Sequence, residues 1–359
     1  MSLERAQIEN ALKQVEDPHN GRDLVSAKSV RNIGIEGGTV SVEIVLGYPA
    51  KSWRDELAAS VRAEVEKLEG VESVSVEVTW EIISHTVQKG VKPLDGVKNM
   101  IAVASGKGGV GKSTVAVNLA LALSAEGARV GILDADIYGP SQPRMLGITG
   151  KPESADGKTM QPLTSYGLQA MSIGFLIDEE TPMIWRGPMV TQALEQMLKD
   201  TSWSELDYLV IDLPPGTGDV PLTMSQLLPL TGAVVVCTPQ KVAQDDARRA
   251  IAMFKQLNVP LLGIVENMSY FVCDHGDEHD IFGRGGAAKL AGSFGAPLLG
   301  TIPIHTALRK NSDAGNPTAN YEDGGPLAEE LTDMVQATAA EISKQAMSDE
   351  MVQPTISVT

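Results

Sequence analysis

Short apolar segments alternate with longer stretches of helical character from residue 99 to about residue 345. Strands that alternate with helices in this way imply a mainly parallel sheet covered by helices on both faces. The pattern therefore predicts an α/β domain over residues 99–345. The expected strands are Met100–Ala104, Arg129–Leu133, Leu168–Met171, Tyr208–Ile211, Ala233–Cys237, Leu261–Val265 and Leu298–Ile302.

Residues 1–83 follow a different order and predict a separate, small α/β domain. Ile8, Leu12 and Val15 have the spacing of one helix face. The remaining elements complete an α-β-β-α-β order: a hairpin around Gly37-Gly38, an amphipathic helix over Trp53–Leu68 and a strand over Val71–Trp80.

Two segments show no regular spacing of apolar residues. Residues 84–98 carry Gly, Pro and Lys and are expected to form a linker between the two domains. Residues 346–359 are expected to form a flexible C-terminal tail.

Composition narrows the class of protein. The 359 residues are 43% hydrophobic, which supports a sizeable core, and the net charge of −17 argues against nucleic acid or anionic lipid as a partner. The two cysteines are far apart in sequence, which fits a reducing compartment better than a disulfide framework. The sequence starts without the apolar core of a signal peptide, and no apolar run approaches the ~18 residues of a spanning helix. We therefore expect a soluble, cytoplasmic protein with no membrane partner.

The segment from Ser105 to Thr114 predicts a phosphate-binding loop. It lies between an apolar strand and a helix, and Gly106, Gly111, Lys112 and Ser113 match the pattern G-x-x-x-x-G-K-[ST]. Glycines let the loop turn tightly and direct backbone N–H groups at a phosphate, and the helix N-terminus adds positive charge. We expect Lys112 to neutralise the β- and γ-phosphates and Ser113 to bind Mg²⁺. The expected nucleotide-binding residues here are Gly106, Lys107, Gly108, Gly109, Val110, Gly111, Lys112, Ser113 and Thr114.

Carboxylates follow two further predicted strands. Asp134 and Asp136 are two residues apart at a strand end and are expected to point to the same side, where a carboxylate can orient an attacking water or hold Mg²⁺ through water. The alternative is that they cap the next element. Asp212 ends a Walker-B-like strand and is expected to support Mg²⁺ through Ser113 or water. Gly216, in the Pro-Pro-Gly-Thr-Gly loop that follows, can present an N–H to the γ-phosphate.

Two features near residue 270 each leave two interpretations open. Asn267 follows the strand Leu261–Val265, and its amide suits either the adenine edge or the capping of a turn. The segment Ser269–Gly283 is expected to be a loop that contains Cys273, His275 and His279. These side chains are potential metal ligands, but a single Cys-x-His is equally compatible with a polar loop that has one incidental cysteine.

Five motifs together resemble one family. Lys107 stands five residues before Lys112 and makes the loop the "deviant" form K-G-G-x-G-K-[ST]. With it, the strings Asp134–Ser141, Trp185–Met189, Ile211–Asp219 and Glu266–Ser269 resemble the Mrp/ApbC family of P-loop ATPases, relatives of the nitrogenase iron protein and the cell-division ATPase MinD. Residues 1–83 resemble a small domain found also in iron–sulfur assembly factors.

The resemblance implies an ATP-hydrolysing homodimer that carries an iron–sulfur cluster to apo-proteins. It implies that Lys107 reaches across the dimer to the partner's nucleotide and that Asp136 lies in switch I near the attacking water. Asp212 and Gly216 would lie in switch II, and Asn267 would contact adenine. The family's cluster, of the [4Fe-4S] type, is bridged by a Cys-x-x-Cys from each subunit.

The chain departs from the family at the cluster loop. Cys273 matches the first cysteine, but the sequence continues Asp-His-Gly where a second cysteine is expected. Two subunits would therefore supply two thiolates instead of four. Cys237 lies in an apolar strand and is interpreted as core, which leaves His275 and His279 as candidate substitutes.

Three functions follow from these observations. The first is an ATP-driven carrier of iron–sulfur clusters. The second is a MinD-like regulatory ATPase, but residues 339–359 lack the basic amphipathic helix that such proteins use at membranes. The third is a nucleotide-dependent interaction module that holds no cluster and uses residues 1–83 to dock clients.

Overall fold

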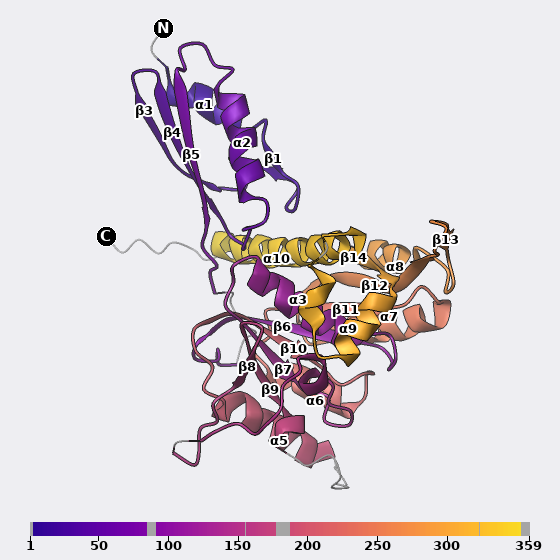
Figure 1. Cartoon of the computed structure of the whole chain (residues 1–359). Coiled ribbons are helices and arrows are strands. Elements are labelled where there is room, and N and C mark those ends of the chain that lie inside the picture. The colour runs from indigo at the N-terminus through magenta and orange to yellow at the C-terminus, as the bar shows by residue number, and fades with distance from the viewer. Residues whose placement is uncertain (1–2, 85–90, 155, 177–186, 323, 353–359) are drawn as a thin grey trace. The chain divides into compact units, whose positions relative to one another are not determined.

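The computed structural model describes residues 3–84, 91–154, 156–176, 187–322 and 324–352 (Figure 1). Contacts divide the chain into two compact units. The first contains residues 1–83, 125–127 and 339–359, and the second contains residues 84–124 and 128–338. Part of the predicted linker, Trp185 and Arg186 of the Trp185–Met189 motif and the last seven residues of the predicted tail lie outside the described residues. The first seven residues of that tail, 346–352, continue the helix that begins at Pro326.

The first unit has the predicted order of helix, strand, strand, helix and strand. β3 (Val30–Glu36) and β4 (Thr39–Leu46) form the antiparallel hairpin, and β5 (Ser73–Trp80) pairs with β4 in parallel. The helices are α1 (Arg5–Leu12) and α2 (Arg54–Val65), and α2 buries Leu57, Val61 and Val65, which recur every four residues along one face. The sequence pattern missed the two-residue strands β1 (Glu16–Asp17) and β2 (Arg22–Asp23).

The second unit contains the predicted, mainly parallel sheet. Among the described residues its order is β13-β12-β11-β6-β10-β7-β9-β8, with β14 beside β12. In the part of this sheet that the structure describes, only the edge strands β8 and β13 pair in an antiparallel manner. The bounds are β6 (Val97–Ser105), β7 (Val130–Asp134), β8 (Leu163–Ser165), β9 (Leu168–Ser172), β10 (Leu206–Asp212), β11 (Gly232–Cys237), β12 (Leu261–Val272), β13 (Glu278–His279) and β14 (Leu298–Ile304).

Helices follow the strands as the alternation predicts. α3 (Lys112–Ala125) is apolar on all sides and ten of its residues are buried, as expected of a helix in the core of a large domain. None of the helices within the described part of the chain has the length and apolar character needed to cross a membrane. The others are α4 (Gln142–Met145), η1 (Ile173–Phe175), α5 (Gly187–Asp200), α6 (Asp219–Leu227), α7 (Lys241–Gln256), α8 (Gly286–Phe294), α9 (Thr306–Asp313), η2 (Pro317–Asn320) and α10 (Pro326–Val352).

The strand order brings the predicted motifs to one edge of the sheet. β10 lies between β6 and β7, and all three are parallel. In the register, Asp212 at the end of β10 is opposite Asp134 at the end of β7 and Val103 near the end of β6. Because the carboxyl ends of parallel strands meet at the same edge, segments more than 70 residues apart converge beside the phosphate-binding loop.

One strand is longer than predicted. β12 was expected to end at Val265 and to be followed by a loop from Ser269, but it runs to Val272 and contains Asn267. The prediction was wrong there because a break in the pattern was interpreted as a strand end. The structure instead has an irregularity: Met268 adopts a positive φ of 56°, and the pairing with β14 shifts between Asn267 and Phe271.

Candidate nucleotide-binding site

The predicted phosphate-binding loop joins the end of β6 to the start of α3. Gly109 and Gly111 adopt φ values of +80° and +81°, which residues with a side chain rarely adopt. A methyl group on Gly111 would also collide with the amide nitrogen of Asn267. Backbone conformation therefore favours glycine at both positions, and close packing excludes a side chain at Gly111 as well.

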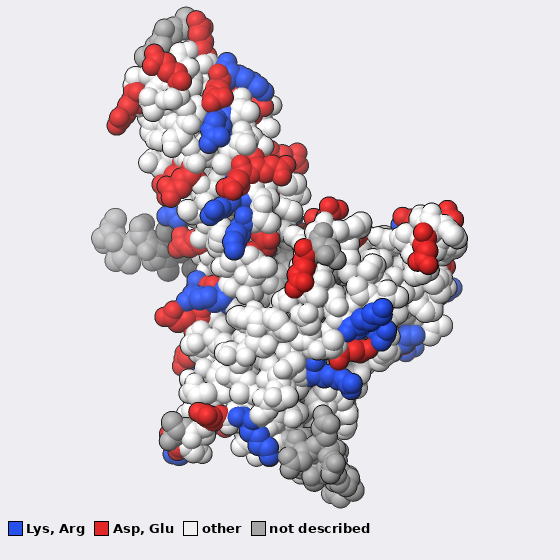
Figure 2. All heavy atoms as spheres, in the orientation of Figure 1, with Lys and Arg blue, Asp and Glu red and all other residues white. Residues whose placement is uncertain are grey.

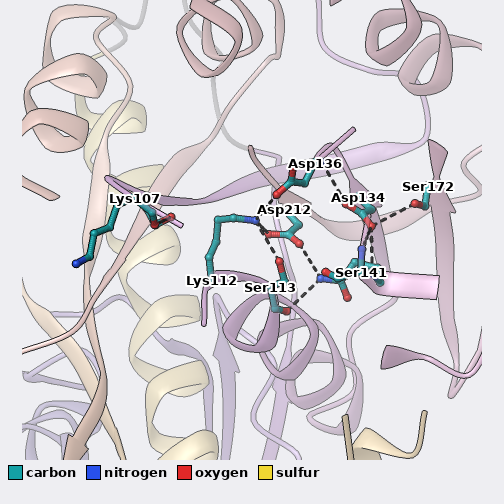
Figure 3. Close-up of polar contacts among 10 residues, drawn as sticks. Lys107, Lys112, Ser113, Asp134, Asp136, Ser141, Ser172 and Asp212 are labelled. Carbon is teal, nitrogen blue, oxygen red and sulfur yellow. Dashed lines mark hydrogen bonds and ion pairs between the residues drawn. The ribbon is translucent and has the colours of Figure 1, made fainter. Parts of the chain in front are cut away.

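Lys112 is the central cation of the site. It is only 6% exposed, and its Nζ contacts Asp212 Oδ1 and lies 3.2 Å from Ser113 Oγ and 4.0 Å from Asp136 Oδ2 (Figure 3). A buried ammonium needs such partners, since an unpaired charge is strongly disfavoured in the interior. Two carboxylates and a hydroxyl thus surround Lys112 where a nucleotide's phosphates are expected.

Asp212 is fully buried and both of its carboxylate oxygens have partners. Oδ1 contacts Lys112, and Oδ2 accepts a hydrogen bond of 2.9 Å from Gln142 Nε2. The same Nε2 donates to the Ser113 carbonyl at 3.1 Å. Sequence reasoning missed Gln142, which follows the Asp134–Ser141 motif and has no distinctive spacing of its own.

The two aspartates at the end of β7 and just beyond it have different partners. Asp134 is fully buried, and its carboxylate accepts hydrogen bonds from the backbone N–H groups of Asp136, Ser141 and Gln142 and from the Ser172 hydroxyl, over 2.9–3.2 Å. Figure 3 shows Asp134 directed toward Ser141 and Ser172, whereas Asp136 is directed toward Lys112. The expectation that both face the same side was wrong. Asp134 caps the following segment, the alternative interpretation, and Asp136 faces the site.

Burial raises the pKa values of both aspartates. For Asp134 the nearby negative charge of Asp212 adds to the effect of burial, and hydrogen bonds from the backbone of Gln142 and Asp136 oppose it. For Asp136 burial is again the main cause, and the positive charge of Lys112 opposes it. A carboxylate whose pKa is raised by burial beside other charged groups is typical of a functional site.

Three other predicted residues are placed around the loop. Asn267 is buried, and its Nδ2 donates a hydrogen bond of 2.8 Å to the Val110 carbonyl, so its amide braces the phosphate-binding loop. The Gly216 N–H donates to the Ser105 carbonyl at 2.9 Å and would have to leave it to reach a phosphate. The Lys107 side chain extends away from Lys112 and the three aspartates (Figure 3).

The oxygen atoms at the site fit Mg²⁺. Ser113, Asp136 and Asp212 supply a hydroxyl and carboxylates, the hard ligands that Mg²⁺ prefers. Within the described ranges no group of three or more His, Cys, Asp and Glu side chains could hold a metal ion by itself.

Cys273 lies in a hairpin at the end of β12. Its N–H donates to the Asp277 carbonyl at 3.0 Å, and β13 brings His279 back beside Phe271. A hydrogen bond with the His279 side chain lowers the pKa of the Cys273 thiol, which favours the thiolate, the form of cysteine that binds metals in general. Cys237 is buried in β11, and burial raises the pKa of its thiol to about 12. The structure thus separates one accessible cysteine from one core cysteine.

The surface shown in Figure 2 carries both signs of charge. Lys and Arg side chains are interspersed with Asp and Glu side chains and form no extended basic area on that face. With a net charge of −17, such a face has no basic groove that would follow a phosphate backbone.

Comparisons with known proteins agree with these motifs. A family model described as "NUBPL iron-transfer P-loop NTPase" matches residues 96–339, and one described as "Iron-sulfur cluster assembly protein" matches residues 5–78. The chain is 48% identical over 316 residues to the iron-sulfur cluster carrier protein of Escherichia coli K12, covering 88% of this chain and 86% of that one. It is 49% identical over 251 residues to the iron-sulfur cluster transfer protein NUBPL of Mus musculus, covering 69% and 78%.

Solved structures share the fold of about two thirds of the chain. A nucleotide-binding protein from Archaeoglobus fulgidus in complex with ADP superimposes with a TM-score of 0.57 at 41% identity, covering 66% of this chain and 92% of that one. The cell-division ATPase MinD of Pyrococcus furiosus superimposes with a TM-score of 0.50 at 24% identity, covering 69% and 99%. At 24% identity, the similarity to MinD concerns the fold alone.

Proposed function

The chain belongs to the family of NUBPL-type iron-transfer P-loop NTPases, and from this membership we propose that it is an ATP-hydrolysing carrier that delivers iron–sulfur clusters to apo-proteins. The observation that carries the proposal is the convergence of Lys112, Ser113, Asp136 and Asp212 at one edge of the sheet. The family match favours the carrier over a MinD-like regulator or a module without a cluster.

When ATP binds, Lys112 exchanges its contacts with Asp212 and Ser113 for contacts with the phosphates. The backbone N–H groups of the loop from Gly106 to Thr114 cradle the phosphates, and Lys112 turns from Asp212 to the β- and γ-phosphates. Ser113, Asp136 and Asp212 are the residues that would hold Mg²⁺, the latter two through water. When bound, the ion would supply positive charge that offsets the negative charge of the phosphates.

Hydrolysis requires a water molecule in line with the γ-phosphate. Asp136 positions that water, whose oxygen attacks the γ-phosphorus as the bond to the ADP oxygen breaks, giving ADP and phosphate. Lys107 of a second copy approaches the same phosphates and stabilises the leaving charge. The Gly216 N–H leaves Ser105 to contact the γ-phosphate, and Asn267 contacts adenine.

The cluster is the cargo of the carrier. A single copy offers Cys273 as its accessible thiol, so we propose that two copies form a homodimer and share one [4Fe-4S] cluster. Since Cys273 is followed by no second cysteine in its hairpin, His275 and His279 are the candidates to complete the ligand set. Release of phosphate relaxes residues 212–219, and we propose that this movement reaches the Cys273 hairpin and releases the cluster.

The remaining parts support this role. We propose that residues 1–83 form an assembly-factor domain, 84–98 a linker, 99–345 the ATPase domain and 346–359 a tail. Two free cysteines and an iron–sulfur cargo are compatible with a reducing compartment, so we propose a cytoplasmic location.

The proposal is tested by loading and transfer. Protein purified without air and reconstituted with iron and sulfide is expected to hold about four iron and four sulfide per two copies. Incubated with an apo-enzyme that requires a [4Fe-4S] cluster, it should restore that enzyme's activity faster in the presence of ATP and Mg²⁺ than free iron and sulfide do.

Two results would contradict the carrier. If the protein hydrolyses ATP but its iron and sulfide content stays at background, it is a nucleotide-dependent module without cargo. Sedimentation with liposomes only in the presence of ATP, again without iron, would identify a MinD-like regulator.

Replacing Lys107 with alanine tests whether this lysine acts on the nucleotide bound by the other copy of the dimer. We expect ATP to bind within about threefold of its native affinity, because Lys107 points away from its own site, and turnover to fall by at least about 100-fold, since a charge supplied in trans acts on the transition state. Fluorescent-nucleotide titration and phosphate release measure the two quantities.

A mixture of variants separates the trans role from a role within one chain. In a mixed dimer the Lys112→Ala copy still supplies Lys107 to the site of the Lys107→Ala copy, so mixing two inactive proteins should restore part of the turnover. Equal loss of nucleotide affinity in both variants, or no restoration on mixing, would contradict the role across the dimer.

A further inference from the structure

The side chain of Gln142 connects three segments of the nucleotide site. Gln142 is the first residue of α4, is 1% exposed, and follows the loop that carries Asp136. Its Nε2 donates to the Ser113 carbonyl at 3.1 Å and to Asp212 Oδ2 at 2.9 Å. One amide nitrogen therefore uses both of its hydrogens to join the phosphate-binding loop to the end of β10.

The backbone of Gln142 is fixed as well. Its N–H donates to Asp134 Oδ2 at 3.0 Å. Asp134 and Asp212 are register partners at the ends of the neighbouring strands β7 and β10. Gln142 thus binds the carboxylates of two adjacent strand ends, one with its main chain and one with its side chain.

The other amide atom of Gln142 has no partner. Oε1 is completely buried and accepts no hydrogen bond from any residue that the structure describes. Turning the amide over would place Oε1 against the Ser113 carbonyl and the Asp212 carboxylate, which are both acceptors, so the observed orientation is the favourable one. Such unpartnered acceptors are rare in proteins, and this one lies beside two residues expected to support Mg²⁺.

We propose that Gln142 is a positioning residue for the hydrated Mg²⁺ of the nucleotide site. By holding Asp212 Oδ2, its Nε2 keeps Oδ1 directed at Lys112 and, after Lys112 turns to the phosphates, at the ion. Oε1 is now completely covered, and once Lys112 has turned to the phosphates it accepts a hydrogen bond from a water bound to that ion. This inference rests on the proposed ATP-binding function and adds to it a residue that recognises the hydrated metal.

The experiment compares nucleotide affinity with and without Mg²⁺. The affinity of a fluorescent ATP analogue is measured in excess Mg²⁺ and in EDTA, and the ratio of the two is the Mg²⁺ enhancement. In Gln142→Leu, which removes both the donor to Asp212 and the acceptor for water, the enhancement is expected to fall about tenfold. A general loss of folding would lower both affinities and leave the ratio unchanged.

A second variant is expected to raise the Mg²⁺ enhancement instead of lowering it. In Gln142→Glu, a carboxylate replaces the amide and faces Asp212, so only a cation relieves the repulsion. Binding in EDTA weakens and the enhancement is expected to rise about threefold or more. Because glutamate has nearly the size of glutamine and is polar, this variant tests the proposal by itself if Gln142→Leu loses its fold.

A matched control is present in the same domain. Gln169 in β9 also bridges two groups, since its Nε2 donates to the Ser204 hydroxyl at 2.9 Å and the Ser204 carbonyl at 3.1 Å. Gln169→Leu should keep the native enhancement. If both Gln142 variants fold and keep the Mg²⁺ enhancement of the native protein, the role of Gln142 is wrong and the proposed function still stands. If the native protein does not bind the ATP analogue, the proposed function itself is wrong.

Discussion

We expect Lys112→Ala to lower ATP turnover by at least about 100-fold, the loss typical of removing one preorganised positive donor from an active site. Lys112 is the buried cation nearest to the expected phosphates, and its neighbours are Asp136 and Asp212. Without it, bound phosphates would face two carboxylates and lose the ammonium group that offsets their charge. Phosphate release and fluorescent-nucleotide binding measure the loss.

The same substitution should destabilise the protein without nucleotide. Asp212 is fully buried and loses its charged partner, and breaking a buried ion pair in this way lowers the free energy of unfolding by about 3 kcal/mol. The double variant Lys112→Ala, Asp212→Asn removes the unpaired charge and should regain much of that stability without regaining turnover. Urea unfolding followed by circular dichroism separates the two effects.

A second lysine–aspartate pair in the same unit, between β6 and β10, is the control. Lys98 of β6 lies 2.9 Å from Asp207 of β10, remote from the phosphate-binding loop. Lys98→Ala should keep native turnover and lose little stability, since Lys98 is partly exposed and such pairs contribute about 1 kcal/mol or less. Turnover by Lys112→Ala within tenfold of the native rate would contradict the assigned role.

The central strands were predictable because they are apolar on both faces. β6, β10 and β11 consist almost entirely of buried residues, and their runs stand out against the helices that cover them. β8 and β13 have three and two residues and lie at the sheet edges, too short for any periodicity to appear. Their pairing depends on the neighbours that the fold brings beside them.

β12 shows how tertiary contacts can hide a strand. Glu266 is fully buried within it, which the sequence pattern treats as a strand end. Its carboxylate accepts hydrogen bonds from Ser269 Oγ at 2.6 Å and from the N–H groups of Gly285 and Ala287 at 3.0 and 2.7 Å. Because two of these partners come from a segment about 20 residues away, no local pattern could reveal that the charge is satisfied.

The site was predictable where a local motif fixes the backbone and unpredictable where distant strands meet. The glycines, Lys112 and Ser113 form one continuous loop, so their spacing alone indicates their chemistry. Asp134 and Asp136 have the same residue type and adjacent positions, yet only the fold decides which one caps and which one faces Lys112. Gln142 joins the site solely through contacts with Ser113 and Asp212.

Cys273→Ala is expected to reduce the iron and sulfide content of reconstituted protein to background. Cys273 is the accessible cysteine of the chain, and the His279 hydrogen bond lowers the pKa of its thiol, so that more of it is present as the thiolate that ligates iron. Nucleotide binding should persist, because Cys273 lies beyond the end of β12 and outside the phosphate-binding loop. Chemical iron and sulfide analysis and visible absorption report the loss.

The other cysteine provides the matched control for this substitution. Cys237 is buried in β11, and burial raises the pKa of its thiol to about 12, so it is inert as a ligand. Cys237→Ala should therefore keep the native iron and sulfide content and show only a modest loss of thermal stability, as expected for a small cavity. If the Cys273 variant keeps as much iron and sulfide as the Cys237 variant, the cargo is held elsewhere on the chain. If native protein and both variants all lack the absorption of a cluster, the chain binds nucleotide without carrying one.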